Sequence, residues 1–571
     1  MPNTPQSNLE AILSGEAPPI DEEEYVPGTI HLIDLGNALN VKKESNSNII
    51  LQPQPSSNIN DVLRWSQKKK KFQFALTWTW AFIIAVVWYG PYYTIWMEEF
   101  STDVNHLNLL SAAMLLGLAF GCIFLQPLAM KYGRRGIYLF CTLLAIMDNA
   151  LGSQAKNFNY IIGSFMISGI SGAPCDSLVP ISSTDVFFIH ERSKYISLMV
   201  LALYAGSFLG PVVGGYIPTW KWCFYIEVIL MSVLFIVLFF LLEDTTFERV
   251  KDSGEKEILE QIKSHETILQ AIQTGELTEA QAQKFGENIK TQVSSLDGNT
   301  SENDASSIDP TIPKRSYAQK LKVVELEYND KRPFITIFTR PFLLVGFPAL
   351  IWGGFVYGAQ IMWLSLLNNT QSQIFTGIYG FSTSNTGLTN LAPFVGSIVG
   401  TFYGGNFVDW LSVKLAERNH GVFEPEFRLY AMVVPTILNS CGLIAYGVAA
   451  NNKAAWEIPA IIGGGFLGFS MSASGPICLS YAADCYAELA SESMVLILFV
   501  RNILACGFTF GMQPWIDKSG LVGTTWLMFM MATIINGSFI IMIIYGKSFR
   551  RMTKKYYYKL SDPNYTPFKF F

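Results

Sequence analysis

The chain has 571 residues, of which 50% are hydrophobic and only 15% are charged, and its formal net charge is −5 at pH 7. This composition is too apolar for a water-soluble protein of this length, and a net negative chain without an extended basic face is not expected to bind nucleic acid. The charges crowd into three stretches, and the apolar segments between them reach about 20 residues or more, enough to cross a bilayer as a helix. The sequence therefore predicts a protein that crosses a membrane many times.

Five segments follow one another along the chain. Residues 1–72 combine "DEEEY" and "QPQPSSN" with few aromatic residues, which predicts a largely disordered tail. Residues 73–243 and 341–546 each contain six apolar segments, so we expect two six-helix halves. The polar residues 244–340 form a central loop between the halves, and residues 547–571 form a basic tail.

Twelve membrane spans are expected, six on each side of the central loop. Their predicted bounds are 73–97, 105–130, 135–155, 159–186, 193–217, 221–243, 341–366, 384–409, 428–450, 457–485, 495–516 and 521–546. Within the central loop, Ile258, Ile262, Leu269 and Ile272 recur at helical spacing among charged residues. That spacing predicts an amphipathic helix in the loop.

The distribution of lysine and arginine predicts the orientation. Lys68 to Lys71 precede the first span, "KYGRRG" links spans 2 and 3, "HERSK" links spans 4 and 5, and "KSFRRMTKK" follows span 12. Because positive loops stay on the cytosolic side, both termini and the central loop are predicted to be cytosolic. Asn368 begins an "NNT" tripeptide on the opposite side, which is a candidate glycosylation site unless the tripeptide is unused.

Several kinds of chemistry lack their sequence signatures. The eight cysteines lie in predicted spans at irregular spacing, which argues against a disulfide framework or a zinc site. The sequence contains neither a Walker-type phosphate loop nor a nucleophile elbow. We therefore expect neither an enzyme nor an ATP-driven pump, and no cofactor or metal.

Span 5 carries the most specific motif, "AGSFLGPVVGG". Its glycines and proline are Gly206, Gly210, Pro211, Gly214 and Gly215. Glycines four residues apart share one helical face and let another backbone approach closely, and the proline bends the helix. The whole string resembles the antiporter motif of the major facilitator superfamily.

Other motifs carry the same resemblance. The superfamily's loop between spans 2 and 3 is matched by Lys131, Gly133, Arg134 and Arg135, and its gate loop after span 4 by Asp185, Glu191 and Arg192. The second half offers Asp409, "EPEFRL", "YAADCYAE" with Asp484 and Glu488, and then Arg501. Together with "VPGTIHLID" before the first span, these motifs resemble the fungal drug:proton antiporter branch, which includes a yeast permease for polyamines and histidinol.

The resemblance implies an all-α major facilitator fold with 12 transmembrane helices in two pseudo-symmetric halves. It also implies alternating access and proton-coupled transport of small organic cations. Two positions depart from the family pattern. Met130 stands where the first loop motif has an aspartate, and Phe165 stands where span 4 commonly has an arginine, so proton coupling here must use other groups.

Ionisable residues inside spans are expensive and point to function. Asp176 in span 4 is predicted near the bilayer middle, and Asp148 in span 3 and Glu227 in span 6 also lie in or near this zone. These carboxylates are candidates for cation binding. The alternative for Asp176 is a protonated or hydrogen-bonded acid that only fixes helix packing, the alternative for Asp148 is a side chain that faces a neighbouring span, and the alternative for Glu227 is a position close to the outer interface. Asp484 and Glu488 are four residues apart on one predicted helix face, and the favoured interpretation of Asp484 is an inner-gate pair with Arg501.

Aromatic residues support a cation site, because their faces attract ammonium groups. From the many aromatic residues of spans 1 and 7 we select Trp88, Tyr89 and Tyr357 for the cavity, together with Gln360. All five histidines lie in predicted loops or tails, so a buried carboxylate is the remaining proton carrier. Asp176 and Glu227 are the candidates.

The sequence therefore predicts a monomeric, proton-coupled importer of polyamines or related organic cations in a fungal plasma membrane, whose partners are the cation, protons and the lipid bilayer. A multidrug exporter is the first alternative, since alternating access is reversible. A transporter-like nutrient sensor is the second, although it would be expected to carry a larger cytosolic domain.

Overall fold

The computed structural model describes residues 26–31, 58–247, 313–324, 332–419 and 421–561. The predicted disordered tail lies mostly outside these residues, and the predicted amphipathic helix of the central loop lies wholly outside them. The chain divides into two units. In the smaller unit, strand β1 (Ile30–His31) pairs antiparallel with β2 (Val422–Phe423), with Ile30 opposite Phe423.

The larger unit consists of Trp65–Phe247, Ser316–Ser412 and Pro425–Phe571. The helices of its N-terminal half are α2 (Gln67–Ile84), α3 (Tyr93–Phe100), α4 (Val104–Tyr132), α5 (Arg134–Ser153), α6 (Phe158–Val186), α7 (Arg192–Gly214) and α8 (Trp220–Leu241). Short 3-10 turns, η2 (Gly90–Tyr92) and η3 (Ile189–Glu191), precede α3 and α7. The connecting helix α11 (Tyr317–Lys320) follows this half.

The C-terminal half follows, with helices of 6 to 48 residues. They are α12 (Phe334–Leu343), α13 (Pro348–Gln371), α14 (Thr383–Leu388), α15 (Leu391–Phe402), α16 (Val408–Arg418), α17 (Val433–Asn451), α18 (Gly464–Cys485), α19 (Ala490–Gly537) and α20 (Phe539–Ser561). Short turns of π or 3-10 helix join them: η5 (Leu344–Gly346), η6 (Ser372–Thr376), η7 (Tyr403–Phe407), η8 (Pro425–Met432), η9 (Ile458–Gly463) and η10 (Ala487–Leu489).

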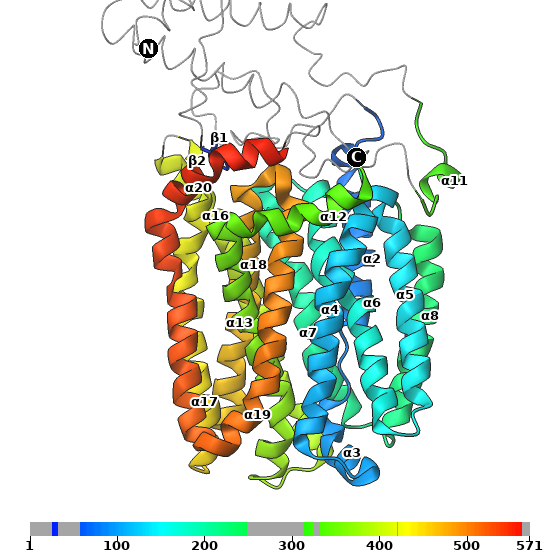
Figure 1. Cartoon of the computed structure of the whole chain (residues 1–571), viewed down its shortest axis with the longest axis vertical. Coiled ribbons are helices and arrows are strands. Elements are labelled where there is room, and N and C mark those ends of the chain that lie inside the picture. The colour runs from blue at the N-terminus through cyan, green and yellow to red at the C-terminus, as the bar shows by residue number, and fades with distance from the viewer. Residues whose placement is uncertain (1–25, 32–57, 248–312, 325–331, 420, 562–571) are drawn as a thin grey trace, which may run out of the picture. The chain divides into compact units, whose positions relative to one another are not determined.

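The predicted all-α membrane class is confirmed. Within the described ranges, nine helical segments are long and apolar enough to cross a membrane, and the last of them, Ala487–Ser561, holds two crossings. The two crossings separate at Gly520, whose φ of 69° is the left-handed conformation that glycine tolerates. With α2 and α6, the structure has twelve spans in two six-helix halves, which stand side by side in Figure 1.

The outer faces of the spans are apolar where they would meet lipid. On α8, Ile229, Val233 and Ile236 are exposed, whereas Met231 and Leu234 on the other face are buried. A helix with apolar residues on both faces suits a position between protein and hydrocarbon. The two ends of the bundle are named here after the helices that lie there in Figure 1: the α12 end and the α3 end.

The first span is not one helix. The helix α2 ends at Ile84, and the chain runs without regular structure until Gly90 starts the turn that leads into α3. Pro91 is at the start of that turn, where it has no N–H to continue a helix and disfavours helical geometry in the residue before it. The break places Trp88 and Tyr89 in the interior of the N-terminal half.

The glycines of the span 5 motif pack against the last turn of α2 and against the broken segment that follows it. A Cβ at Gly206 would lie 2.6 Å from the Phe82 carbonyl oxygen, and one at Gly210 would lie 2.6 Å from the Val87 carbonyl oxygen. No real Cβ approaches a backbone so closely, so a side chain at either position would push the segment away. The motif thus fixes the position of the residues that follow α2.

Candidate cation site

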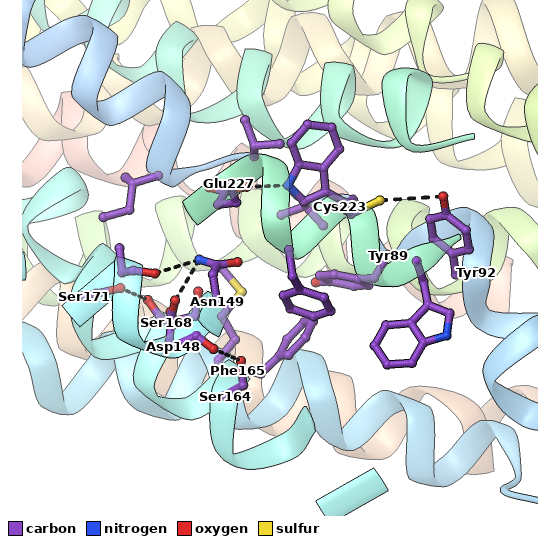
Figure 2. Close-up of a pocket in the computed structure, with 18 of the residues that line it drawn as sticks. Tyr89, Tyr92, Asp148, Asn149, Ser164, Phe165, Ser168, Ser171, Cys223 and Glu227 are labelled. Carbon is purple, nitrogen blue, oxygen red and sulfur yellow. Dashed lines mark hydrogen bonds between the residues drawn. The ribbon is translucent and has the colours of Figure 1, made fainter. Parts of the chain in front are cut away.

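A pocket inside the N-terminal half, named here the side pocket, lies between the segment after α2 and helices α4, α5, α6 and α8 (Figure 2). Residues that line it include Trp88, Tyr89, Tyr92, Trp96, Asp148, Asn149, Ser164, Phe165, Ser168, Trp220, Cys223 and Glu227. Four residues predicted for substrate binding therefore meet here: Trp88, Tyr89, Asp148 and Glu227. None of the described lining residues is a lysine or an arginine.

Both acids of the side pocket are buried, with exposed fractions of 1% for Asp148 and 4% for Glu227. The Trp88 indole N–H donates to the Glu227 carboxylate. The dashed line at Glu227 in Figure 2 marks this hydrogen bond. The Asn149 amide donates to Asp148 Oδ1 at 2.7 Å, whereas Asp148 Oδ2 has no donor among the described residues. Burying such groups without a counter-ion is costly, so the pocket favours the entry of a cation or a proton.

Helix contacts fix where these acids point. The Ser164 hydroxyl on α6 donates to the backbone carbonyl of Asp148 at 2.8 Å, which holds α5 against α6. A Cβ at Gly152, one turn further along α5, would lie 2.5 Å from the Phe224 ring. The small residue therefore allows α5 and α8 to pack closely, and this packing brings Asp148 and Glu227 to the same pocket.

Aromatic rings form the wall of the side pocket. The Tyr89 ring meets Phe165 edge to face with 4.8 Å between centroids, and Trp96 meets Trp220 in the same way at 5.9 Å. Phe165 is the residue that replaces the family's arginine. In this chain the position therefore adds an apolar ring to the wall, and among the residues that the structure describes no lysine or arginine lines the pocket beside the acids.

A second space, the central cavity, is lined by both halves of the bundle. Its lining includes Ile84, Val87, Tyr89, Ser111, Met114, Leu118, Asp176, Leu203, Ser207, Ile361, Leu364, Ser365, Asn368 and Arg501. Four residues, Ile84, Val87, Tyr89 and Met114, line the side pocket as well. The two spaces are therefore neighbours, and these side chains form the partition between them.

Asp176 does not stand alone in the central cavity, because Arg501 of α19 pairs with it. Arg501 Nη1 donates to Asp176 Oδ1 at 3.0 Å, and Nη2 donates to Oδ2. Arg501 Nε also donates to the Asn502 side-chain oxygen at 3.0 Å, and the guanidinium carbon lies 4.7 Å from the centroid of the Tyr357 ring. The pair joins the two halves inside the bundle.

This arrangement corrects the predicted partner of Arg501. Asp484 does not pair with Arg501; it accepts from Arg428 Nε at 2.6 Å and from Arg192 Nη1 at 2.8 Å. Asp484 lies near the end of α18, far along the span from the middle, and the arginine of "EPEFRL" reaches it from η8. The predicted shared face of Asp484 and Glu488 is also wrong, since α18 ends at Cys485 and Glu488 lies in η10.

The Asp484 contacts belong to a network that joins the halves at the α12 end. Arg428 Nη1 donates to Asp409 Oδ1 at 2.8 Å, and the backbone N–H of Lys194 donates to Asp409 Oδ2 at 2.9 Å. Arg192 and Lys194 come from α7, whereas Asp409 and Arg428 come from the C-terminal half. Acids of the C-terminal half, held by donors from both halves, thus close the bundle at this end.

The loop between α4 and α5 forms its own contacts at the same end. Arg134 pairs with Asp185, while Arg135 donates to the carbonyls of Phe239 and Leu242, at 2.6 and 2.8 Å. Gly133, with φ of 97°, makes the turn, and Lys131 lies in the last turn of α4. Asp185 lies in the last turn of α6, so Arg134 at the start of α5 is tied to the end of span 4.

At the α3 end, neutral groups join the halves. The Tyr93 hydroxyl and the Ser111 hydroxyl both donate to Asn369 Oδ1 at 3.0 Å. The neighbouring Asn368 is 6% exposed and lines the central cavity, and the Thr370 hydroxyl donates to the Leu366 carbonyl inside α13. The predicted glycosylation of Asn368 is therefore corrected: the tripeptide is part of a buried helix, whereas a glycan acceptor must be accessible.

The last two residues chosen from the sequence have different surroundings. Tyr357 is buried beneath Arg501 and does not line either cavity. Gln360 is completely buried, donates to Asn536 at 2.9 Å and accepts from Asn439 at 3.3 Å. Gln360 therefore belongs to a cluster of amides within the C-terminal half, apart from the acids of the side pocket.

Three charged residues were missed from the sequence. Arg428 lies at the centre of the network at the α12 end, and Glu426 accepts from Arg550 Nη2 at 2.6 Å and Nε at 3.0 Å. All three are buried. The sequence feature that could have pointed to them is "EPEFRL". It places an acid and a base two residues apart beside a span, and such charges require partners when they are buried.

Known proteins resemble this chain over most of its length. The model of the Major Facilitator Superfamily matches residues 75–509. Protein HOL1 of Saccharomyces cerevisiae is 27% identical over 577 residues, covering 94% of this chain and 97% of that protein. Multidrug transporter TPO1_2 of Candida glabrata is 26% identical over 449 residues, covering 77% of this chain and 68% of that protein.

Solved structures show the same fold. The human organic anion transporter MFSD10 (TETRAN) has a TM-score of 0.53 with this chain at 13% identity, covering 83% of this chain and 100% of that one. At this identity the likeness concerns the arrangement of helices. The likeness therefore does not indicate which cargo this chain carries.

Proposed function

This chain belongs to the major facilitator superfamily, and we propose that it carries small organic cations of the polyamine class by alternating access coupled to protons. Its family and its relatives make it a membrane transporter and not an enzyme. The observation that carries the proposal is the side pocket: two buried carboxylates, Asp148 and Glu227, lie within aromatic walls and without a described basic residue.

The chemistry of the side pocket suits an ammonium group. Carboxylates without a basic neighbour attract cations and repel anions, and aromatic faces such as those of Trp88 and Tyr89 add cation–π attraction of about 0.5–2 kcal/mol each. A linear polyamine has charges separated by methylene groups. Its charges suit the acids, and its methylenes suit the rings and the apolar residues of the adjoining central cavity.

Proton coupling is assigned to one carboxylate of the central cavity and one of the side pocket. Asp176 and Glu227 are the proposed proton carriers, because each is buried and each can lose its partner when it is protonated. One carboxylate cannot hold a proton and a cation at the same time, so the two compete for these acids. This competition would couple proton transport to cation transport. An importer of this kind takes up its cargo faster when the outer solution is acidic.

The membrane arrangement is part of the proposal. Lys131, Arg134 and Arg135 lie at the α12 end, so we assign this end to the cytosol, together with both termini, and place the protein in the plasma membrane as a monomer. The halves contact each other at both ends, through Arg192 and Asp484 at one and Tyr93 and Asn369 at the other. This supports assignment to an occluded state between the outward-open and inward-open forms.

Uptake of labelled spermidine into cells without their own carriers tests the proposal. We expect saturable, acid-stimulated uptake, and a loss of about tenfold or more in uptake at low substrate when Asp148→Asn or Glu227→Gln removes a charge, which corresponds to about 1.4 kcal/mol or more of binding. Glu98→Gln, which removes an exposed acid on α3, is the matched control and should leave uptake unchanged. Absence of spermidine uptake by the surface-expressed parent protein would contradict import.

A multidrug exporter is the second candidate. It is favoured by the relative named as a multidrug transporter and by the many apolar residues of the central cavity, such as Ile361 and Leu364. Efflux from preloaded cells separates the two candidates. Export of bulky lipophilic cations without inward movement of spermidine would replace the polyamine proposal with this one.

A further inference from the structure

We propose that the central cavity selects its cargo for N–H groups, because Arg501 is a built-in cation that the cargo must replace at Asp176. This inference rests on the proposed transport of organic cations and specifies their chemistry. A primary, secondary, tertiary or guanidinium cation, each of which carries an N–H group, would be accepted at the centre of the protein, whereas a quaternary ammonium ion of the same charge would be rejected.

The contact between Arg501 and Asp176 is a hydrogen-bonded one. Two guanidinium N–H groups reach the two carboxylate oxygens, one at 3.0 Å and the other closer, in the bidentate geometry that arginine offers. Both side chains are buried, with 1% exposure for Arg501 and 5% for Asp176. In such surroundings each carboxylate oxygen needs a donor, because an unsatisfied buried acceptor is costly.

The central cavity gives a cargo access to this pair. Asp176 and Arg501 both line it, and Ser207 and Ser365 provide further polar groups around the same space. A cargo that approached Asp176 from the cavity would meet a carboxylate whose oxygens are already satisfied. To take the place of Arg501, it must offer the oxygens hydrogen bonds of its own and not only a positive charge.

Arg501 keeps other partners when it leaves Asp176. Its Nε donates to Asn502 on the same helix, and the Tyr357 ring lies beneath the guanidinium. These contacts move with the C-terminal half, whereas Asp176 belongs to the N-terminal half. Replacement of Arg501 by cargo therefore removes a direct link between the halves, so a cargo that makes this exchange also frees the halves to move.

The side pocket would not make this distinction by itself. Attraction to aromatic faces and to buried carboxylates depends mainly on charge, and quaternary ammonium ions bind well in aromatic surroundings. Selection for N–H groups is thus a property of the central pair. This separation lets one set of compounds test the inference apart from the proposed function.

A graded series of diamines provides the test. Pentane-1,5-diamine and its tetramethyl and hexamethyl derivatives all carry two positive charges at the same spacing. The tetramethyl compound keeps one N–H at each end and the hexamethyl compound has none, although the two differ by only one methyl group at each end. Competition with labelled spermidine uptake by the full-length protein is the measurement.

We expect the hexamethyl compound to compete at least about tenfold more weakly than the tetramethyl compound, because a site built around hydrogen bonds rejects a ligand that cannot form them. Agmatine, with a guanidinium group like that of Arg501, should compete strongly. Equal competition by the tetramethyl and hexamethyl compounds would overturn the inference and leave cation transport standing. Competition by none of the compounds would overturn the proposed function.

Variants locate the selection. In Asp176→Asn/Arg501→Gln, which replaces both charges by amides of similar shape, purified protein should still bind the dications at the side pocket but should no longer distinguish the tetramethyl from the hexamethyl compound in thermal-shift titrations. Asp148→Asn should weaken both compounds and keep their ratio. A double variant that retains the full parental discrimination would show that the ion pair is not its source.

Discussion

Single residues of the candidate site were predictable where their chemistry stands out locally. Asp148, Glu227, Trp88 and Tyr89 could be chosen because acids and clustered aromatic residues are unusual inside spans, and the structure brings these four to one pocket. Pairings were not predictable. Arg501 and Asp176 are separated by 325 positions, and spacing along one helix does not encode which distant helix supplies the partner.

The hydrogen bond between Trp88 and Glu227 leads to a prediction at this scale. Trp88→Phe keeps an aromatic face but removes the N–H donor to the buried Glu227 carboxylate. Leaving that carboxylate without its donor costs about 1–3 kcal/mol, so Glu227 is held less firmly in the pocket. We expect the half-saturating spermidine concentration to rise about fivefold or more, with little change in surface expression. Trp222→Phe, an exposed tryptophan on α8, is the matched control. A half-saturating concentration within twofold of the parent would show that the indole N–H has no role.

At the scale of elements, hydropathy predicts where spans lie because burial in lipid requires about 20 apolar residues per helix. Hydropathy does not predict a break inside a span. The first span was expected at 73–97, but the helix ends at Ile84, since Pro91 and the close approach of α7 favour an irregular segment there. Apolar residues flank the break on both sides, so it leaves no mark in the hydropathy. The residues of the break line the side pocket.

The contact between the span 5 glycines and the broken segment predicts a stability effect. Gly210→Ala would place a Cβ 2.6 Å from the Val87 carbonyl oxygen, so α7 must move, at a cost of about 1–3 kcal/mol. We expect a lower Tm in detergent and reduced spermidine uptake. Gly507→Ala on α19 is the control, because a Cβ there meets nothing within 4 Å. Equal Tm values for the two variants would contradict the close-packing argument.

At the scale of the whole molecule, the two halves are joined at three levels: Arg192 and Asp484 at the α12 end, Arg501 and Asp176 in the middle, and Tyr93 and Asn369 at the α3 end. Alternating access requires that the contacts at one end break while those at the other remain. The ends differ in chemistry. Charged pairs close the α12 end, whereas neutral hydrogen bonds close the α3 end, so the α12 end is the harder one to open without a compensating charge.

Removing a charge from the network at the α12 end should therefore open that end. Arg428→Gln leaves Asp409 buried without an arginine and leaves Asp484 with Arg192 alone, a change that costs about 3–5 kcal/mol while the halves stay in contact. Separation of the halves lets water reach the acids and relieves this cost. A bias of about 3–5 kcal/mol is enough to make a minor open state the major one, since about 5.5 kcal/mol would move a two-state population the whole way from 1:99 to 99:1.

Thiol labelling measures the opening. The Ser480 hydroxyl of α18 lies 3.3 Å from that of Ser193 on α7, so a cysteine introduced by Ser480→Cys should be protected while the halves touch. In the Arg428→Gln background we expect a membrane-impermeant maleimide, added from the α12 side, to label position 480 at least tenfold faster, as measured by mass spectrometry of that peptide. Glu488→Gln, an exposed acid nearby, is the control and should leave the rate unchanged. Equal rates in all backgrounds would show that Arg428 does not hold the halves together, because the protection of position 480 would then come from packing alone.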